Sequence, residues 1–142
     1  MKNILKEKMW AYIVHHNPDL MISLQNDFSA TQYLEEKVNG IMPLVEKLKA
    51  EGKPLYVIEE LCLSEMTKEL KPSKFLYILA VLEEEFEDHY YRLKENGTLT
   101  YEIINMIAVC KDCFESFEFS EETEDNRHLR YAIIGQIHNH IN

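Results

Sequence analysis

Cys110 and Cys113 have the spacing of a CxxC motif, which allows two sulfurs to form a disulfide or to bind one metal ion. The apolar residues on both sides continue one helical period, so we predict that the pair lies in the middle of a helix. A thioredoxin-type redox pair instead follows a strand at a helix N-terminus, and a structural zinc site needs a second pair of Cys or His. We therefore interpret one cysteine as buried and the other as lying on the flank of the helix, with a redox pair as the alternative.

The acidic stretch 83–89 places several carboxylates and the imidazole of His89 close together in the sequence. Di-iron helical bundles use a Glu-x-x-His spacing, in which both side chains project from adjacent turns. Phe86 occupies the position three residues before His89, so this spacing is absent. Glu85 lies four residues before His89, a spacing that would allow the two to pair on the solvent side of a helix.

The remaining histidine clusters are His15 with His16, and His138 with His140. Residues one or two apart on a helix point in different directions, so neither cluster binds a metal by itself. Four imidazoles could converge only if the two ends of the chain met. The sequence also lacks a G-x-S-x-G elbow and a glycine-rich phosphate loop. We therefore predict no enzyme activity, no cofactor and no bound metal.

Tyrosine is abundant, with eight residues, and there is one tryptophan. Tyrosines suit interaction surfaces because each combines a large apolar area with a polar tip, and the adjacent Tyr90 and Tyr91 cannot both face inward. We therefore single out Tyr90, Tyr91 and Trp10 as a candidate interaction surface. The plainer interpretation, which we favour for most of the rings, is that they fill the core with their hydroxyls at its edge.

The element expected to organise the chain is one long helix over residues 73–96. Its apolar residues recur at intervals of three or four throughout. Ser73 can cap its start after Pro72, and Gly97 is typical of a helix end. The residues that form this apolar face are Phe75, Leu79, Leu82, Phe86, Tyr90 and Leu93.

The same periodicity predicts further helices and no strands. In the helix that begins near Ser29 we expect a kink or a break between Gly40 and Pro43, because a proline inside a helix costs roughly 3 kcal/mol. The segment 20–24 is too short to assign to a helix or a loop. Together the helices predict one all-α domain over residues 1–142, a bundle of five to six helices around residues 73–96.

Charge and cysteine content indicate the surroundings of the protein. Fifteen Lys and Arg against 25 Asp and Glu leave a formal charge of -10, which argues against nucleic acid as a partner. No run approaches the roughly 18 apolar residues that a membrane span needs, and the first residues lack the features of a secretory signal. Three cysteines fit reduced thiols better than a disulfide framework, so we expect a cytoplasmic protein.

Three segments of the chain are similar to those of a known family: the Asn17-Pro18-Asp19-Leu20 turn, Ser73-Lys74-Phe75, and the segment from Val109-Cys110 to Phe114. With them the chain resembles a family of small helical bacterial proteins known as a domain of unknown function, found in gut and oral anaerobes and often near genes of conjugative elements. The resemblance covers nearly the whole chain. It implies a single all-helical domain and supplies no catalytic residues.

These observations favour a non-enzymatic accessory or interaction protein whose partner is another protein. The alternative is a thiol-based redox or metal-dependent regulator that uses Cys110 and Cys113. A third hypothesis is an acidic decoy for a DNA-binding protein, because residues 83–88 and 115–125 are densely negative. The identity of the partner and the oligomeric state stay open at this point.

Overall fold

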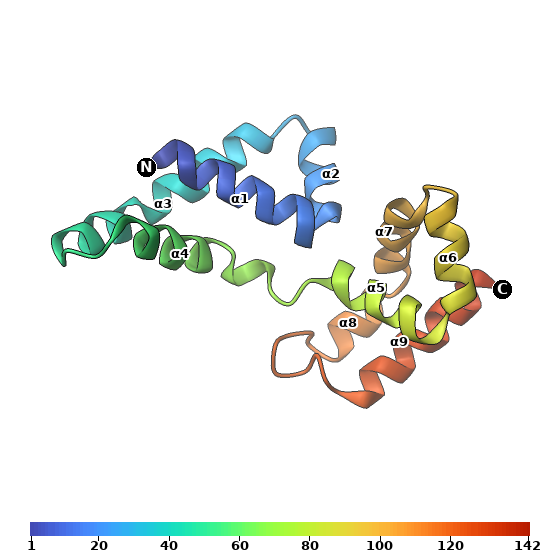
Figure 1. The fold of residues 1–142 in the computed structure, drawn as a ribbon. Helices are drawn as coiled ribbons and strands as arrows, with labels where there is room; N and C mark the ends of the chain where they lie inside the picture. The colour runs from blue at the N-terminus through green and yellow to red at the C-terminus, as the bar shows by residue number, and fades with distance from the viewer. The chain divides into compact units, whose positions relative to one another are not determined.

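The structure is a computed structural model that describes all 142 residues, and it contains helices and turns but no strand (Figure 1). The prediction of an all-α protein is therefore confirmed. None of the helices has both the length and the hydrophobicity that crossing a membrane requires. The chain divides into two compact units, Met1–Leu70 and Lys71–Asn142, each with its own hydrophobic core. That residues 1–142 form a single domain stays a prediction.

The first unit is built on three helices that pack against one another, α1, α3 and α4. Its apolar positions follow the helical repeat: Leu5, Met9 and Ile13 recur every four residues along α1 and are completely buried. They meet Val38 and Val45 of α3 in the core. The elements of this unit are α1 (Lys2–His16), α2 (Pro18–Asn26), α3 (Ala30–Ala50), α4 (Leu55–Met66) and a 3-10 turn (Lys68–Leu70).

The helix α3 runs unbroken through Gly40 and Pro43, so of the two expected outcomes, a kink or a break, the break does not occur. Pro43 is exposed, while Ile41 and Val45 on either side of it are buried. Burial of such side chains stabilises by about 1.5–3 kcal/mol each, which offsets the roughly 3 kcal/mol cost of an internal proline. The segment that the sequence left unassigned belongs to α2, a nine-residue helix with Pro18 at its first position.

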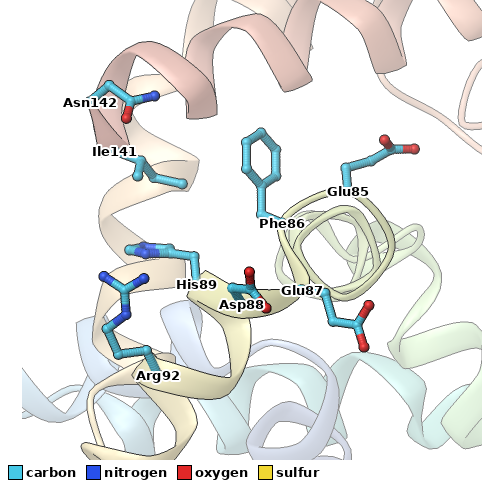
Figure 2. A pocket seen from close by; sticks show the side chains of 8 residues that line it. All are labelled: Glu85, Phe86, Glu87, Asp88, His89, Arg92, Ile141 and Asn142. Atoms are coloured by element: carbon cyan, nitrogen blue, oxygen red, sulfur yellow. The ribbon is translucent and has the colours of Figure 1, made fainter.

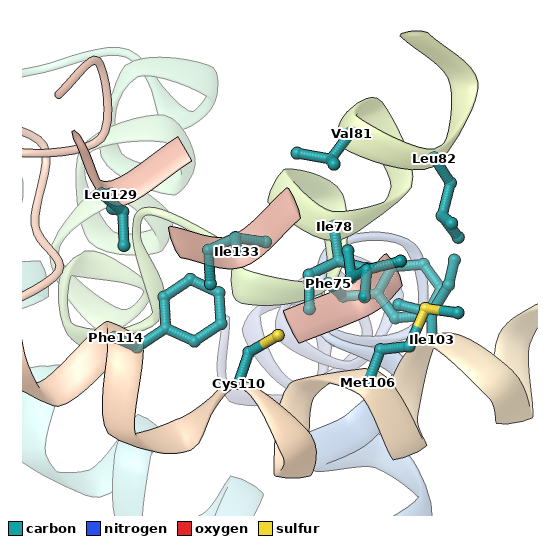
Figure 3. Packing of buried hydrophobic residues seen from close by; sticks show 11 residues of the cluster. Phe75, Ile78, Val81, Leu82, Ile103, Met106, Cys110, Phe114, Leu129 and Ile133 are labelled. Atoms are coloured by element: carbon teal, nitrogen blue, oxygen red, sulfur yellow. The ribbon is translucent and has the colours of Figure 1, made fainter. Parts of the chain in front are cut away.

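The second unit surrounds a core to which α5, α7 and α9 contribute buried residues (Figure 3). Ser73 caps α5 as predicted, because its hydroxyl oxygen accepts a hydrogen bond of 3.1 Å from the Leu76 N–H. Asn126 caps α9 in the same way by accepting from the N–H groups of His128 and Leu129. The elements of this unit are α5 (Lys74–Glu85), α6 (Glu87–Glu95), α7 (Leu99–Val109), α8 (Lys111–Ser116) and α9 (Arg127–Ile141).

The long helix over residues 73–96 is not present, and the bundle of five to six helices around it is replaced by nine shorter α-helices. Phe86, with φ -134° and ψ 49°, leaves the helical region and separates α5 from α6. A continuous helix would stack Glu83 on Glu87 and Glu84 on Asp88, and like charges four residues apart are destabilising. The break instead places Glu87 and Asp88 in the first turn of α6, where the helix dipole favours them.

Four helices end in the same hydrogen-bonded turn, the Schellman motif, with one residue in the left-handed region. At the end of α2, for example, the Ser29 N–H donates to Leu24 C=O and the Phe28 N–H donates to Gln25 C=O. Glycine is the usual residue at the left-handed position because it has no Cβ to clash. In this chain the four positions are Phe28, Gly52, Gly97 and Glu118.

Candidate functional site

The CxxC motif spans a helix break, which corrects the prediction that it lies in the middle of one helix. Cys110 separates α7 from α8, and Cys113 belongs to the first turn of α8. Figure 3 shows the Cys110 side chain pointing into the second unit's core beside Phe114. Cys110 has no exposed surface, whereas Cys113 is half-buried. Cys110 therefore serves as a core side chain.

Burial raises the pKa of Cys110 to about 12, and the neighbouring Cys113 adds to this increase. Burial also raises the pKa of Cys113, with a further contribution from Asp112. Because the thiolate is the nucleophile and the metal ligand, both shifts lower the reactivity of these thiols at neutral pH. Residues 1–142 contain no group of three or more His, Cys, Asp or Glu that could hold a metal ion.

In the folded protein we expect an alkylating reagent to modify Cys113 first. Cys62 is buried in the first unit's core and Cys110 in the second, so both should react only as the chain opens. Peptide mass spectrometry after timed labelling with iodoacetamide measures this order. A Cys113→Ser variant provides the control. Labelling of Cys110 in the native protein at the rate of a free thiol would instead favour the redox alternative.

The break between α5 and α6 leaves an open hollow of about 510 Å³ (Figure 2). In that view His89 and Arg92 project from α6 next to each other, whereas Glu85 and Glu87 point away from them. The pairing that the sequence spacing would allow between Glu85 and His89 is not formed, because the break places them on different helices. The lining residues are Glu85, Phe86, Glu87, Asp88, His89, Arg92, Ile141 and Asn142.

One carboxylate beside this hollow, that of Glu85, already has a basic partner on α9. The Arg130 guanidinium donates hydrogen bonds of 2.6 Å to Glu84 and 3.2 Å to Glu85, which ties α9 to the end of α5. The hollow itself is lined by both acidic and basic side chains. Its charges therefore favour no single class of ligand.

Two of the histidines considered as metal ligands contact other side chains. His140 lies 2.7 Å from a carboxylate oxygen of Glu102, a contact between α9 and α7. The ring of His16 stacks on Tyr12, with centroids 4.2 Å apart and an interplanar angle of 4°. Both arrangements connect a histidine to its own unit.

The structure separates the two adjacent tyrosines that the sequence singled out. Tyr90 is half-buried against the second unit's core, whereas Tyr91 is exposed, and their rings meet edge to face at 5.3 Å. Sequence reasoning did not distinguish other tyrosines that are at least as exposed. These are Tyr56, Tyr101 and Tyr131.

The third residue of the candidate surface, Trp10, lies in the first unit beside a shallow groove of about 340 Å³. Residues of α1 form one side of this groove and the first turns of α3 form the other. Most of its accessible wall is apolar, and the two charged residues that line it, Lys6 and Glu7, both belong to α1. The lining residues are Lys6, Glu7, Trp10, Ala30, Thr31 and Leu34.

Phe28, in the turn between α2 and α3, is the residue that sequence reasoning missed. Its side chain is 96% exposed, and its backbone has a φ of 55°. It comes two residues before Ala30, which lines the Trp10 groove. The one sequence signal was a lone aromatic residue between Asp27 and Ser29. That signal could not be interpreted, because the helix α2, whose end forms the turn, was not assigned from the sequence.

These features define an all-α protein of two compact helical units, in which an exposed aromatic residue stands two positions before a residue that lines an apolar groove. Comparisons of the chain with protein-family models, with curated proteins and with solved structures found no match. The resemblance to a helical domain family of anaerobic bacteria therefore stays a prediction.

Proposed function

We propose that the protein is a non-enzymatic interaction module that binds a protein partner through the turn between α2 and α3. The observation that carries this proposal is the nearly complete exposure of Phe28. Burying a phenylalanine side chain contributes about 1.5–3 kcal/mol, and Phe28 contributes almost none of this to the fold. The same burial is available to a complex.

The backbone at position 28 strengthens this argument. The left-handed region costs a residue with a Cβ roughly 1–2 kcal/mol, and two of the four equivalent helix ends in this chain carry glycine. The phenylalanine ring therefore adds almost nothing to the free energy of unfolding, and we expect a glycine at this position to raise it. Strained backbone positions cluster at functional sites, and at this one the ring is presented to solvent.

The surroundings of Phe28 support a protein partner. Asp27 precedes it, and the whole chain has a formal charge of -10. An acidic flank is repelled by phosphate groups, both in nucleic acid and on an anionic membrane. Aromatic side chains are common among the residues that contribute most of the energy of protein interfaces.

A photoreactive phenylalanine analogue at position 28 tests the proposal. We expect it to crosslink to a polypeptide in the cells that make this protein, because the side chain lies inside the contact. The matched control carries the analogue at Tyr56, an aromatic residue of the same unit that is 66% exposed. Equal adducts at both positions, or none at position 28, would contradict the proposal.

Replacing Phe28 with glycine should stabilise the isolated chain by about 1 kcal/mol, because glycine adopts the left-handed conformation without strain. Glu118→Gly is the matched control, since Glu118 occupies the same position in another helix end with φ 49°. Chemical denaturation of the three proteins measures the difference. A destabilised Phe28→Gly variant would mean that the ring serves the fold, contrary to the proposal.

A further inference from the structure

We infer that the partner is a second copy of this chain, and that Phe28 of each copy fills the Trp10 groove of the other. This inference rests on the proposed function, because it names the partner of the same surface. It starts from a complementarity within the first unit. A projecting apolar ring and an apolar groove lie two residues apart along the chain, at Phe28 and Ala30.

Phe28 does not fill the groove of its own chain, because 96% of its side chain is exposed. The groove, about 340 Å³ in volume, offers the side chains of Trp10 and Leu34 to a ring that enters it. Aromatic rings pack favourably on one another edge to face or offset, so Trp10 suits a phenylalanine ring. The ring and the groove are thus both apolar, and within one molecule neither is covered by the other.

A dimer with two-fold symmetry would contain this contact between ring and groove twice. In a symmetric dimer each residue that contacts a partner residue is contacted by its counterpart in return. An axis that passes between the α2–α3 turn and the groove therefore inserts both copies of Phe28 at once. The contact closes on itself, so a dimer forms rather than a filament.

The charges beside the ring and the groove include one complementary pair, Asp27 and Lys6, although the exposed Glu7 also lines the groove. Asp27 is exposed and forms no ion pair, whereas Lys6 lines the groove and its one ion pair, to the exposed Glu35, is 3.6 Å long. Insertion of Phe28 brings Asp27 towards Lys6 of the other copy. Electrostatic repulsion between two copies is weaker at the first unit than at the second. Residues 1–70 contain 8 Lys against 11 Asp and Glu, and the rest of the negative charge lies in residues 71–142.

Sedimentation equilibrium of the purified full-length chain, from micromolar to millimolar concentration, tests the inference. We expect a reversible monomer–dimer equilibrium. Phe28→Gly and Trp10→Ala should each raise the dimer dissociation constant at least about tenfold, as expected for central aromatic contacts. Glu118→Gly and Tyr56→Ser, which change the same helix-end position elsewhere and another exposed aromatic residue, should leave it unchanged.

A charge exchange tests the predicted register of the two copies. Asp27→Lys should weaken the dimer because it places two lysines together, and adding Lys6→Asp should restore it. Restoration in the double variant supports the arrangement even if Trp10→Ala proves too unstable to measure. A double variant that dimerises no better than Asp27→Lys overturns it.

A wild-type chain that stays monomeric at the highest concentration would overturn the inference, as would a dimer that Phe28→Gly does not weaken. These results are distinct from failure of the proposed function. If the chain is monomeric but the analogue at position 28 crosslinks to a different protein, the interaction module stands and only the identity of its partner is wrong.

Discussion

Replacing Phe114 with alanine is expected to destabilise the second unit by about 3–5 kcal/mol. Phe114 is 1% exposed and packs among Cys110, Leu129 and Ile133 in the core (Figure 3). Its ring also meets Phe119 at a centroid distance of 4.8 Å and Tyr77 at 5.7 Å. Truncation removes these contacts and leaves a cavity that a well-packed core fills only in part.

The size of this effect is large for so small a unit. Whole domains are stable by only about 5–15 kcal/mol, and units of some 70 residues lie near the lower end. Amide hydrogen exchange measures the loss residue by residue. We expect reduced protection in α5, α7 and α9, which supply the residues around Phe114, with little change in α1, α3 and α4.

Phe117→Ala is the control for this experiment, because Phe117 is only partly buried against the same core and should cost much less. Equal loss of protection in residues 1–70 and 71–142 would show that the two units unfold as one. Such a result would contradict the expectation that the loss of Phe114 affects the second unit alone.

The free energy of unfolding is expected to fall between pH 9 and pH 12, with a large contribution from Cys110. Its pKa is about 12 in the folded protein against an ordinary value of 9.0. Above pH 9 the unfolded chain releases this proton while the folded chain retains it, so rising pH favours unfolding. The full shift corresponds to about 4 kcal/mol, complete once the pH exceeds the folded value.

Tyrosine side chains contribute in the same direction, since burial also raises the pKa of Tyr77. A Cys110→Ala variant isolates the thiol, because it lowers stability by a constant amount below pH 9 and removes the thiol's share of the pH dependence. Denaturant titrations at several pH values measure both curves. Parallel curves for the wild type and Cys110→Ala would contradict the prediction, and Cys113→Ala serves as the half-buried control.

The start of α5 could be predicted from the sequence because local chemistry determines it. The Ser73 hydroxyl acts within one turn of the chain, so its effect does not depend on distant residues. Helix breaks were harder to predict. The apolar repeat continues across both Phe86 and Cys110, where the structure interrupts it, because each break places the next helix against the same core.

The candidate site was only partly predictable for a related reason. Trp10 was singled out for its type, and it does line a groove. Phe28 was not, because left-handed helix ends are normally recognised by glycine, and the end of α2 has none. Whether a ring is exposed depends on how distant segments of the chain pack around it, and no local sequence pattern contains that information.

The sequence by itself determined that the protein is helical, acidic and without a recognisable catalytic motif, because helical periodicity and charge are properties of neighbouring residues. Only the tertiary structure decided that the apolar residues form two cores rather than one, that Cys110 is sealed in the second, and that Phe28 remains in solvent. Burial is a collective outcome of packing between distant segments, so it becomes visible only once the chain is folded.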